Sequence, residues 1–383
     1  MEYVGFGQIV LGILTQLIPV WIAIFVVMGL SWTFHRKLSL YGRIYESPAG
    51  LIGLFIVFFW LFCALFADLI SPFDPLEQFA ILKNKGPGVI EPTTGLVQYL
   101  GGDKFGRDVF SRMISGSQIV MVIAPAATMF AFVVGISLGL PAGYYRGKID
   151  SILSFLANMV LAFPVILLFY LLVTPGIRET ALPQSMAGVF FIFPILFFGM
   201  LFYSRFRERP QKLMWQLAIV LIFGGWVYIS LVFDADPFGV LSLEPNELNI
   251  FVAVVFASSP GVFRIVRGLT MDIATRDYVA AAQTRGEIPF YVMLWEILPN
   301  ARGPLIVDAC LRIGYTTILL GTLGYFGLAL VPESPDWGTT IKEGSRLLRL
   351  YYHPALPPAI ALMSFVLGLN LLADALREQS LKD

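Results

Sequence analysis

The stretch LIGLFIVFFWLFCALFA, residues 51–67, contains no charged side chain. A helix needs about 20 predominantly apolar residues to cross the hydrocarbon core of a bilayer, and the apolar run around this stretch, from Ala49 to Ile70, meets that length. The whole chain has the same character, since 57% of its 383 residues are hydrophobic and 14% are charged. Soluble domains carry about 25% charged residues. We therefore expect a membrane protein.

Eight further apolar runs have a similar length. The first has no basic segment before it and is too long for the apolar part of a signal peptide, so we interpret it as a retained helix. Together with the run at 49–70, they predict an all-α polytopic membrane protein with nine transmembrane helices. The eight runs are Phe6–Phe34, Gln118–Gly143, Ser151–Thr174, Ser185–Ser204, Leu213–Phe233, Leu248–Val266, Gly303–Leu330 and Ala355–Leu376.

Lys and Arg residues between the runs predict the orientation, because short cytoplasmic loops are enriched in both. With the N-terminus outside, the cytoplasmic segments carry 16 Lys and Arg residues and the external segments carry 9. The loop at 205–212 is then internal, whereas the loop that holds Asp234, Asp236, Glu244 and Glu247 has no cation and is external. We therefore expect an external N-terminus and a cytoplasmic C-terminus.

Several classes of protein are excluded by the composition. Lys and Arg together number 26, as do Asp and Glu, so no cationic excess is present to neutralise a nucleic acid. Two Cys and two His, each pair far apart, give neither a disulfide framework nor a metal site. No G-x-x-x-x-G-K-[ST] loop or G-x-S-x-G motif is present. We expect no enzymatic activity, no catalytic residue, no metal and no cofactor in this chain.

Residues 267–302 form an internal stretch that is longer than most connections between helices. Its first half, from about Met271, favours a helix with small residues at Ala281 and Ala282, where a partner can approach closely. Gly286 can take the left-handed conformation that ends a helix, and Pro289 suits the first turn of a second helix, which would end at Pro299. The residues alone fit an ordinary solvated loop equally well.

This stretch resembles the "EAA" loop of bacterial ABC importer permeases, and three other stretches support the resemblance. Together they are similar to the dipeptide/oligopeptide (Opp/Dpp) permease family, C-subunit type. One departure is that Ala280 occupies the position of the glutamate in the EAA motif. The four stretches are Arg276–Asn300, Leu100–Asp108, Gly139–Tyr145 with Gly147 and Asp150, and Pro332–Gly338.

The resemblance implies an ABC type I importer permease core of about six helices, divided by an insertion. Residues 49–176 would be the first part of the core, with an external loop at 71–117. Residues 248–383 would be the second part, with the coupling loop at 267–302. The additional segments are an extra N-terminal helix with its linker, 1–48, and an inserted hairpin of two helices, 177–247.

The function implied by this resemblance is ATP-driven import of peptides or similar solutes across a bacterial or archaeal plasma membrane. The partners would be a second homologous permease, two ATPase subunits that bind ATP and Mg, an extracytoplasmic solute-binding protein and membrane lipid, but no nucleic acid. The loop around Gly286 would dock in a cleft of an ATPase. The coupling residues would be Asp277, Tyr278, Ala281, Ala282, Gly286, Leu298 and Pro299.

Two other functions remain open, a stand-alone secondary transporter or channel and a membrane scaffold without transport activity. Co-purification with ATPases would exclude the transporter, and a Gly286 loop that binds no partner would favour the scaffold. Members of the family carry dipeptides, longer peptides, nickel complexes, glutathione or oligosaccharides. No residue pattern in this sequence identifies the solute.

Two groups of residues within the predicted helices have a structural interpretation. Gly135, Gly139 and Gly143 recur every four residues, so another helix can approach closely, and packing within the subunit is the preferred role. Asp308 and Arg312 lie four residues apart on one helix face and can neutralise each other. We expect them to form a structural ion pair.

Two external motifs have alternative roles. The first motif contains Asp103, Gly106, Arg107 and Asp108. It either forms a surface beneath a binding protein or is a solvated loop held by an ion pair of Arg107 with one of the two aspartates. We favour the structural role. Trp337-Gly338 predicts a turn whose aromatic ring anchors the chain at the membrane interface, and the alternative is direct contact with the substrate.

Overall fold

The computed structural model describes residues 2–35, 39–174, 177, 180–239, 245–328 and 333–380. The chain divides into two compact units, Met1–Pro125 with Cys310–Asp383, and Ala126–Ala309. We refer to them as unit 1 and unit 2. Parts of the sequence predictions, including Pro332 of the last motif, lie outside the described residues.

Within the described residues, seven single helices are long and apolar enough to cross a membrane, and the number rises to nine if each of two bent helix pairs is one span. One pair joins α1 (Phe6–Gln16) to α2 (Ile18–Thr33) with a bend of 52°, and the other joins α6 (Gly147–Leu161) to α7 (Val165–Val173) with a bend of 74°. The expectation of an all-α polytopic membrane protein is confirmed. The seven single spans are α3 (Pro48–Leu65), α5 (Val109–Tyr145), α9 (Ala181–Phe206), α10 (Pro210–Phe233), α11 (Pro245–Ile273), α15 (Arg302–Phe326) and α17 (Leu356–Ser380).

Proline residues lie at both bends. Pro19 is in the first turn of α2, and Pro164 immediately precedes α7. Proline has no N–H to donate and its ring clashes with the preceding turn, so a continuous helix is interrupted there.

The extramembrane part of unit 1 holds short elements. A two-stranded antiparallel ribbon pairs β1 (Val89–Ile90) with β2 (Val97–Gln98). The helix α5 begins at Val109, whereas the apolar run predicted a start at Gln118. The predicted external loop at 71–117 therefore ends in a helix. The other short elements are η2 (Ser39–Glu46), α4 (Ala67–Ile70), η3 (Ala80–Leu82) and α16 (Trp337–Ser345).

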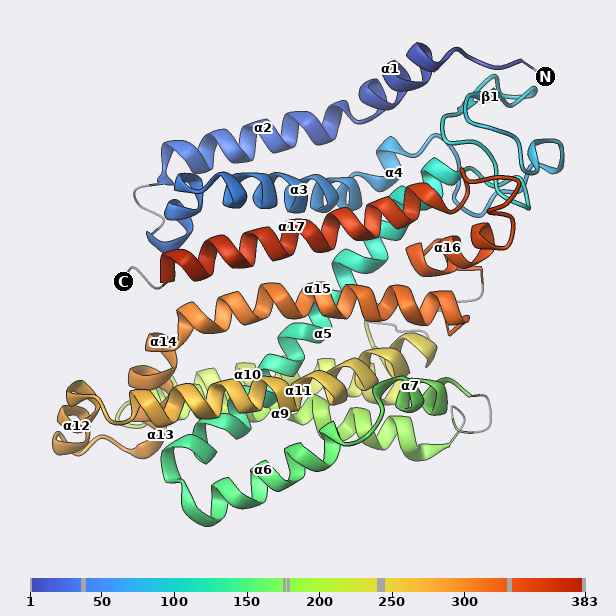
Figure 1. The fold of residues 1–383 in the computed structure, drawn as a ribbon. Helices are drawn as coiled ribbons and strands as arrows, with labels where there is room; N and C mark the ends of the chain where they lie inside the picture. Colours follow the sequence, from blue (N-terminus) through green and yellow to red (C-terminus); the bar gives the residue numbers. More distant parts are fainter. Residues whose placement is uncertain are drawn as a thin grey trace. The chain divides into compact units, whose positions relative to one another are not determined.

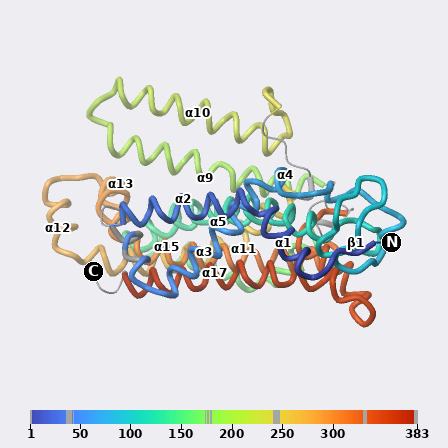
Figure 2. Tube along the Cα trace, turned by 90° about the horizontal axis from the view of Figure 1, so that it is seen from above, coloured from blue at the N-terminus to red at the C-terminus, as the bar shows by residue number. Residues whose placement is uncertain are grey.

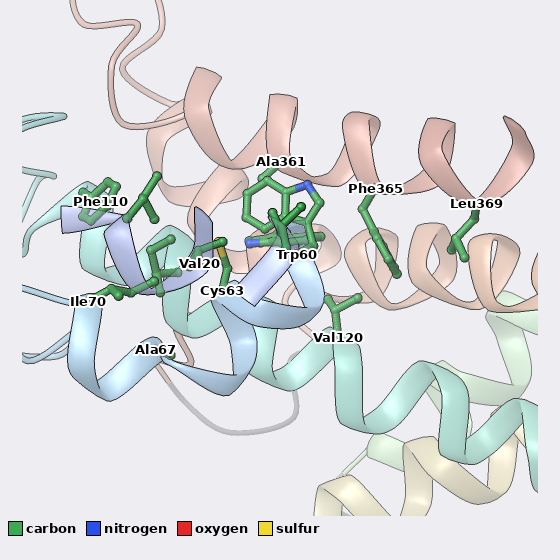
Figure 3. Close-up of a cluster of buried hydrophobic side chains, with 14 residues drawn as sticks. Val20, Trp60, Cys63, Ala67, Ile70, Phe110, Val120, Ala361, Phe365 and Leu369 are labelled. Carbon is green, nitrogen blue, oxygen red and sulfur yellow. The ribbon is translucent and has the colours of Figure 1, made fainter. Parts of the chain in front are cut away.

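The core of unit 1 lies where α3 runs alongside α17 (Figure 1). A Cβ on Gly53 of α3 would lie 2.8 Å from the carbonyl oxygen of Gly368, so glycine permits this close approach. The Trp60 indole donates a hydrogen bond to Ser364 Oγ at 2.9 Å. Figure 3 shows the Trp60 and Phe365 side chains within the buried apolar cluster between these helices.

Trp337 belongs to this core, so its interpretation as an interface anchor in a turn is wrong. Its side chain is 1% exposed, and its ring centroid lies 5.0 Å from that of Trp60. Trp337 is the first residue of α16, and Asp336 caps that helix by accepting a hydrogen bond from the Thr339 N–H at 2.8 Å. Gly338 faces α15, where a Cβ would lie 2.1 Å from the carbonyl oxygen of Gly321. Packing therefore determines both positions.

In unit 2, the second half of α5 packs against α11 through three glycines. A Cβ would lie 2.5 Å from Val262 Cβ at Gly135 and 2.8 Å from Val266 Cβ at Gly139. At Gly143 a Cβ would lie 2.7 Å from the carbonyl oxygen of Arg267. The three glycines thus allow the two backbones to lie closer than larger residues would permit.

The helices α9 and α10 form an antiparallel hairpin within unit 2 (Figure 2). The last residues of α9 and the first of α10 are separated by the short turn at 207–209. Only 11% of the most apolar stretch of each helix is buried. The hairpin therefore leaves most of its apolar surface uncovered by the rest of the chain.

We predict that Gly139→Leu destabilises unit 2. The added side chain collides with α11, and overpacking of this kind costs about 1–3 kcal/mol. Thermal unfolding of the purified protein in detergent measures the effect. The matched control is Gly199→Leu on α9, because no heavy atom lies within 4 Å of a Cβ built there. Equal melting temperatures for the two variants would contradict the prediction.

Candidate functional site

The segment between α11 and α15 folds as two helical pieces joined by a tight turn. The first piece is α12 (Asp277–Thr284). The second is a continuous helical run that comprises α13 (Pro289–Tyr291), the π-helix η4 (Val292–Ile297) and α14 (Leu298–Asn300). We call residues 277–300 the coupling segment. The helix–turn–helix expected at 267–302 is therefore present, with the second helix ending one residue after Pro299.

The turn of the coupling segment requires glycine because of its backbone conformation. Gly286 has φ +80°, which is left-handed, and its N–H donates to the Gln283 carbonyl at 2.9 Å. The Glu287 N–H closes the turn by donating to the Ala282 carbonyl at 3.3 Å. No heavy atom lies within 4 Å of a Cβ built on Gly286. Space is therefore available for a side chain, but the left-handed conformation disfavours one.

One face of the coupling segment is buried in the core of unit 2. Val279 and Ala282 of α12 are fully buried, as are Val292 and Ile297 of the second piece. They belong to one apolar cluster with Leu140, Val262 and Val266 of α5 and α11. The expectation that Ala282 faces a partner is therefore wrong, because this residue packs inside its own chain.

Polar contacts also attach the coupling segment to its neighbours. Gln283 Nε2 donates to Tyr144 Oη of α5 at 3.0 Å. Trp295 Nε1 donates to Ser204 Oγ of α9 at 3.1 Å, and the Arg205 guanidinium lies 4.8 Å from the Trp295 ring centroid. Contacts at each end of the segment thus restrict its movement relative to the helices of unit 2.

The contact between α9 and Trp295 could not be predicted from the sequence. Ser204 and Trp295 are 91 positions apart. No local pattern of residues connects the end of a predicted span to the middle of a loop.

The other face of the coupling segment is exposed. Asp277, Ala281 and Thr284 are exposed, and Tyr278 is 39% exposed. At the far end, Pro299 is exposed and Leu298 is half-buried. The segment therefore exposes a face of mainly small and polar residues, while its opposite face is packed against α5 and α11.

The external motif of unit 1 is organised by a buried network of charges. Arg107 is fully buried and donates to Asp103 Oδ2 at 2.7 Å and also to Glu343. Arg112, also fully buried, lies 3.4 Å from Glu343 Oε2, and Lys104 Nζ lies 3.4 Å from Glu343 Oε1. Glu343 thus joins three cations. The expectation of a solvated loop is wrong, although the ion pair of Arg107 with Asp103 is present.

Asp108 and Gly106 shape the same motif in other ways. Asp108 accepts hydrogen bonds from the backbone N–H and the hydroxyl of Ser111, at 2.8 and 2.7 Å, and burial raises its pKa to about 6. Gly106 has φ +82°, and a Cβ there would lie 1.9 Å from the carbonyl oxygen of Phe79. Gly106 is therefore required both for conformation and for space.

The remaining candidate residues lie on α15. Asp308 and Arg312 are four residues apart on this helix, and their ion pair stays a prediction. Within the described part of the chain, no group of three or more His, Cys, Asp or Glu residues is arranged to hold a metal ion.

Two family descriptions match the chain. The sequence model described as "Binding-protein-dependent transport system inner membrane component" matches residues 135–380. The model described as "N-terminal TM domain of oligopeptide transport permease C" matches residues 42–87. The resemblance to the C-type dipeptide/oligopeptide importer permeases is thereby confirmed.

Curated relatives cover most of the chain. The di/tripeptide transport system permease protein of Pseudomonas aeruginosa is 27% identical over 334 residues, which are 87% of this chain and 88% of the relative. The glutathione transport system permease protein of Pectobacterium atrosepticum is 26% identical over 334 residues, covering 87% of this chain and 86% of the relative. Since the first family match spans more than half of the sequence, the chain belongs to the family of binding-protein-dependent transport system inner membrane components.

Proposed function

We propose that this chain is a membrane-spanning permease subunit that imports peptides or similar solutes, with its coupling segment docked on a cytoplasmic ATPase. It works with a second homologous permease, two ATPase subunits that bind ATP and Mg, and an extracytoplasmic solute-binding protein. The N-terminus lies outside and the C-terminus in the cytoplasm. The names of the curated relatives support the class of solute.

The observation that carries this proposal is the division of the coupling segment into a buried and an exposed face. Val279 and Ala282 fix α12 to the core, whereas Asp277, Ala281 and Thr284 remain accessible. An element that moves with the permease core transmits a displacement of its partner to the transmembrane helices, whereas a solvated loop would absorb it. A stand-alone secondary transporter has no need for such a surface.

We propose further that the external motif keeps the outer part of unit 1 in shape and does not itself bind the solute-binding protein. Arg107 and Arg112 are both fully buried, so a partner cannot reach their side chains in this conformation. Residues 177–247 are proposed to be an insertion into a core formed by 49–176 and 248–383, after an additional N-terminal segment at 1–48.

We predict that Ala281→Trp uncouples the permease from its ATPase. The residue is exposed on α12, so the larger side chain obstructs the docking surface and leaves the core intact. The amount of co-expressed ATPase that purifies with the permease should fall about tenfold, which corresponds to about 1.4 kcal/mol. The matched control is Ala235→Trp, at an exposed position just after the C-terminal end of α10. Unchanged co-purification of Ala281→Trp would contradict the docking proposal.

Substitutions at Gly286 separate backbone conformation from side-chain size. Gly286→Val should abolish coupling because a β-branched residue is strongly disfavoured at φ +80°. Gly286→Asn should retain most of it, since asparagine tolerates the left-handed region and space is available. ATP turnover of the reconstituted complex measures both. Equal losses in the two variants would show that side-chain bulk matters and that conformation does not.

We predict that Glu343→Gln lowers the thermal stability of the protein. The substitution leaves Arg107 and Arg112 buried with less compensating charge, and breaking a buried pair costs about 3–5 kcal/mol. Glu77→Gln, at an exposed position of the same external region, is the control. A Glu343→Gln protein with unchanged melting temperature but lost affinity for its binding protein would instead assign this motif a receptor role.

A further inference from the structure

Two cavities follow one another along α9 and the coupling segment. The first has a volume of about 310 Å³ and is apolar. It is lined by residues of α9 and of the coupling segment, among them Leu196, Met200 and Phe290, and also by residues 137, 140 and 141 of α5. The second has a volume of about 450 Å³ and is polar. It is lined by Ser204–Arg209 at the end of α9 and by Gly286–Ile288 and Tyr291 of the coupling segment.

The two cavities are adjacent on the two elements that line both of them. On α9 the apolar cavity ends at Met200 and the polar cavity begins at Ser204, which is about one helical turn further along. On the coupling segment, Phe290 lines the first cavity and the neighbouring Tyr291 lines the second. Along α9 toward its C-terminal end, the apolar cavity is therefore followed by the polar cavity.

The polar cavity has an excess of positive charge. Its lining residues include three arginines, Arg205, Arg207 and Arg209, and two glutamates, Glu208 and Glu287. Among the residues that the structure describes, Arg207 and Arg209 form no ion pair. Guanidinium groups bind phosphate oxygens well, because their N–H groups form a planar fork that matches the geometry of the anion.

The position of the cavities at the end of the hairpin indicates a membrane molecule. Both α9 and α10 are apolar spans whose surfaces are mostly exposed, so lipid acyl chains surround them. The turn at 207–209 joins the two apolar spans, so we expect its arginines near the level of the lipid headgroups. In the topology proposed above, this turn is cytoplasmic, and basic pockets between transmembrane helices on that side bind anionic lipid headgroups.

We propose that an anionic phospholipid binds between α9 and the coupling segment, with its phosphate at Arg207 and Arg209 and one acyl chain in the apolar cavity. A soluble acidic protein would match the arginines alone. A phospholipid matches both cavities and their order. The polar cavity borders Gly286, which belongs to the turn proposed to dock on the ATPase, but its arginines lie at the end of α9. The proposal therefore adds a lipid ligand to the ATPase docking proposed above.

The bound lipid would contribute to the position of the coupling segment. Trp295 already contacts Ser204 and Arg205 of α9, beside the polar cavity. A lipid that fills both cavities adds contacts between the same two elements. The hairpin and the coupling segment are then held together by protein and lipid jointly.

The experiment compares the lipid affinity of the full-length protein with that of charge variants, using native mass spectrometry of lipids retained from nanodiscs. We expect phosphatidylglycerol to be retained in preference to phosphatidylcholine. The double variant Arg207→Gln with Arg209→Gln should weaken that retention about thirtyfold, if each cation contributes as surface cations do. The matched control is Arg302→Gln, an exposed cation of unit 2 outside both cavities.

A second variant tests the apolar cavity without altering charge. Leu196→Trp fills part of it from α9, where Leu196 is 54% exposed, and should reduce retention while the melting temperature in phosphatidylcholine stays unchanged. Equal retention of both lipids, or equal losses in the arginine and Arg302 variants, would overturn the proposal. So would arginine variants that retain lipid normally but no longer purify with an ATPase. The lipid measurement needs neither ATPase nor transport, so its failure leaves the proposed function untouched.

Discussion

The close packing of α5 on α11 is the contact on which the coupling segment depends. Gly139 lets Val266 approach to a distance that no side chain on α5 would allow. Val266 of α11 and Leu140 of α5 form an apolar surface. Val279 and Ile297 of the coupling segment are buried against this surface. Without this apolar surface of α5 and α11, one apolar face of the coupling segment would be exposed to water. Its buried and exposed faces therefore result from a contact between transmembrane helices.

The external part of unit 1 is held together by buried ion pairs, whereas the core is held together by apolar contacts. Arg107 and Arg112 are fully buried, and each is paired with Glu343. Burial of unpaired charges costs several kcal/mol, so this arrangement is stable only while the carboxylate and both guanidinium groups are in place. The network ties the start of α5 to α16, on which Glu343 lies. Part of the extramembrane structure is thus held by one residue whose partners are distant in the sequence.

The seven single candidate spans could be predicted because the bilayer restricts each helix separately, through its length and apolar character. The start of α5 could not, since Arg112 ends the apolar run although its charge is paired inside the protein. Trp337 was misinterpreted because an aromatic residue beside a polar loop fits an interface as well as a core. Its burial is decided by Trp60, which is far away in the sequence.

Within the candidate site, the sequence predicted the turn but not the orientation of its helices. Left-handed Gly286 and helix-starting Pro289 are local features, and both have the expected conformation. Ala281 and Ala282 are chemically identical, so only tertiary packing decides which of them is buried. An eight-residue helix such as α12 contains too few apolar residues to define its own inner face.

The hairpin of α9 and α10 has consequences for the coupling segment beyond covering the lipid-facing surface. Two additional spans leave the sidedness of all later helices unchanged, so topology alone permits them. A hairpin that only covered the surface would end independently of its neighbours. Instead α9 ends with Ser204 accepting a hydrogen bond from Trp295, and with Arg205 over the same ring. Any displacement of the coupling segment must therefore move the end of α9 or break these contacts.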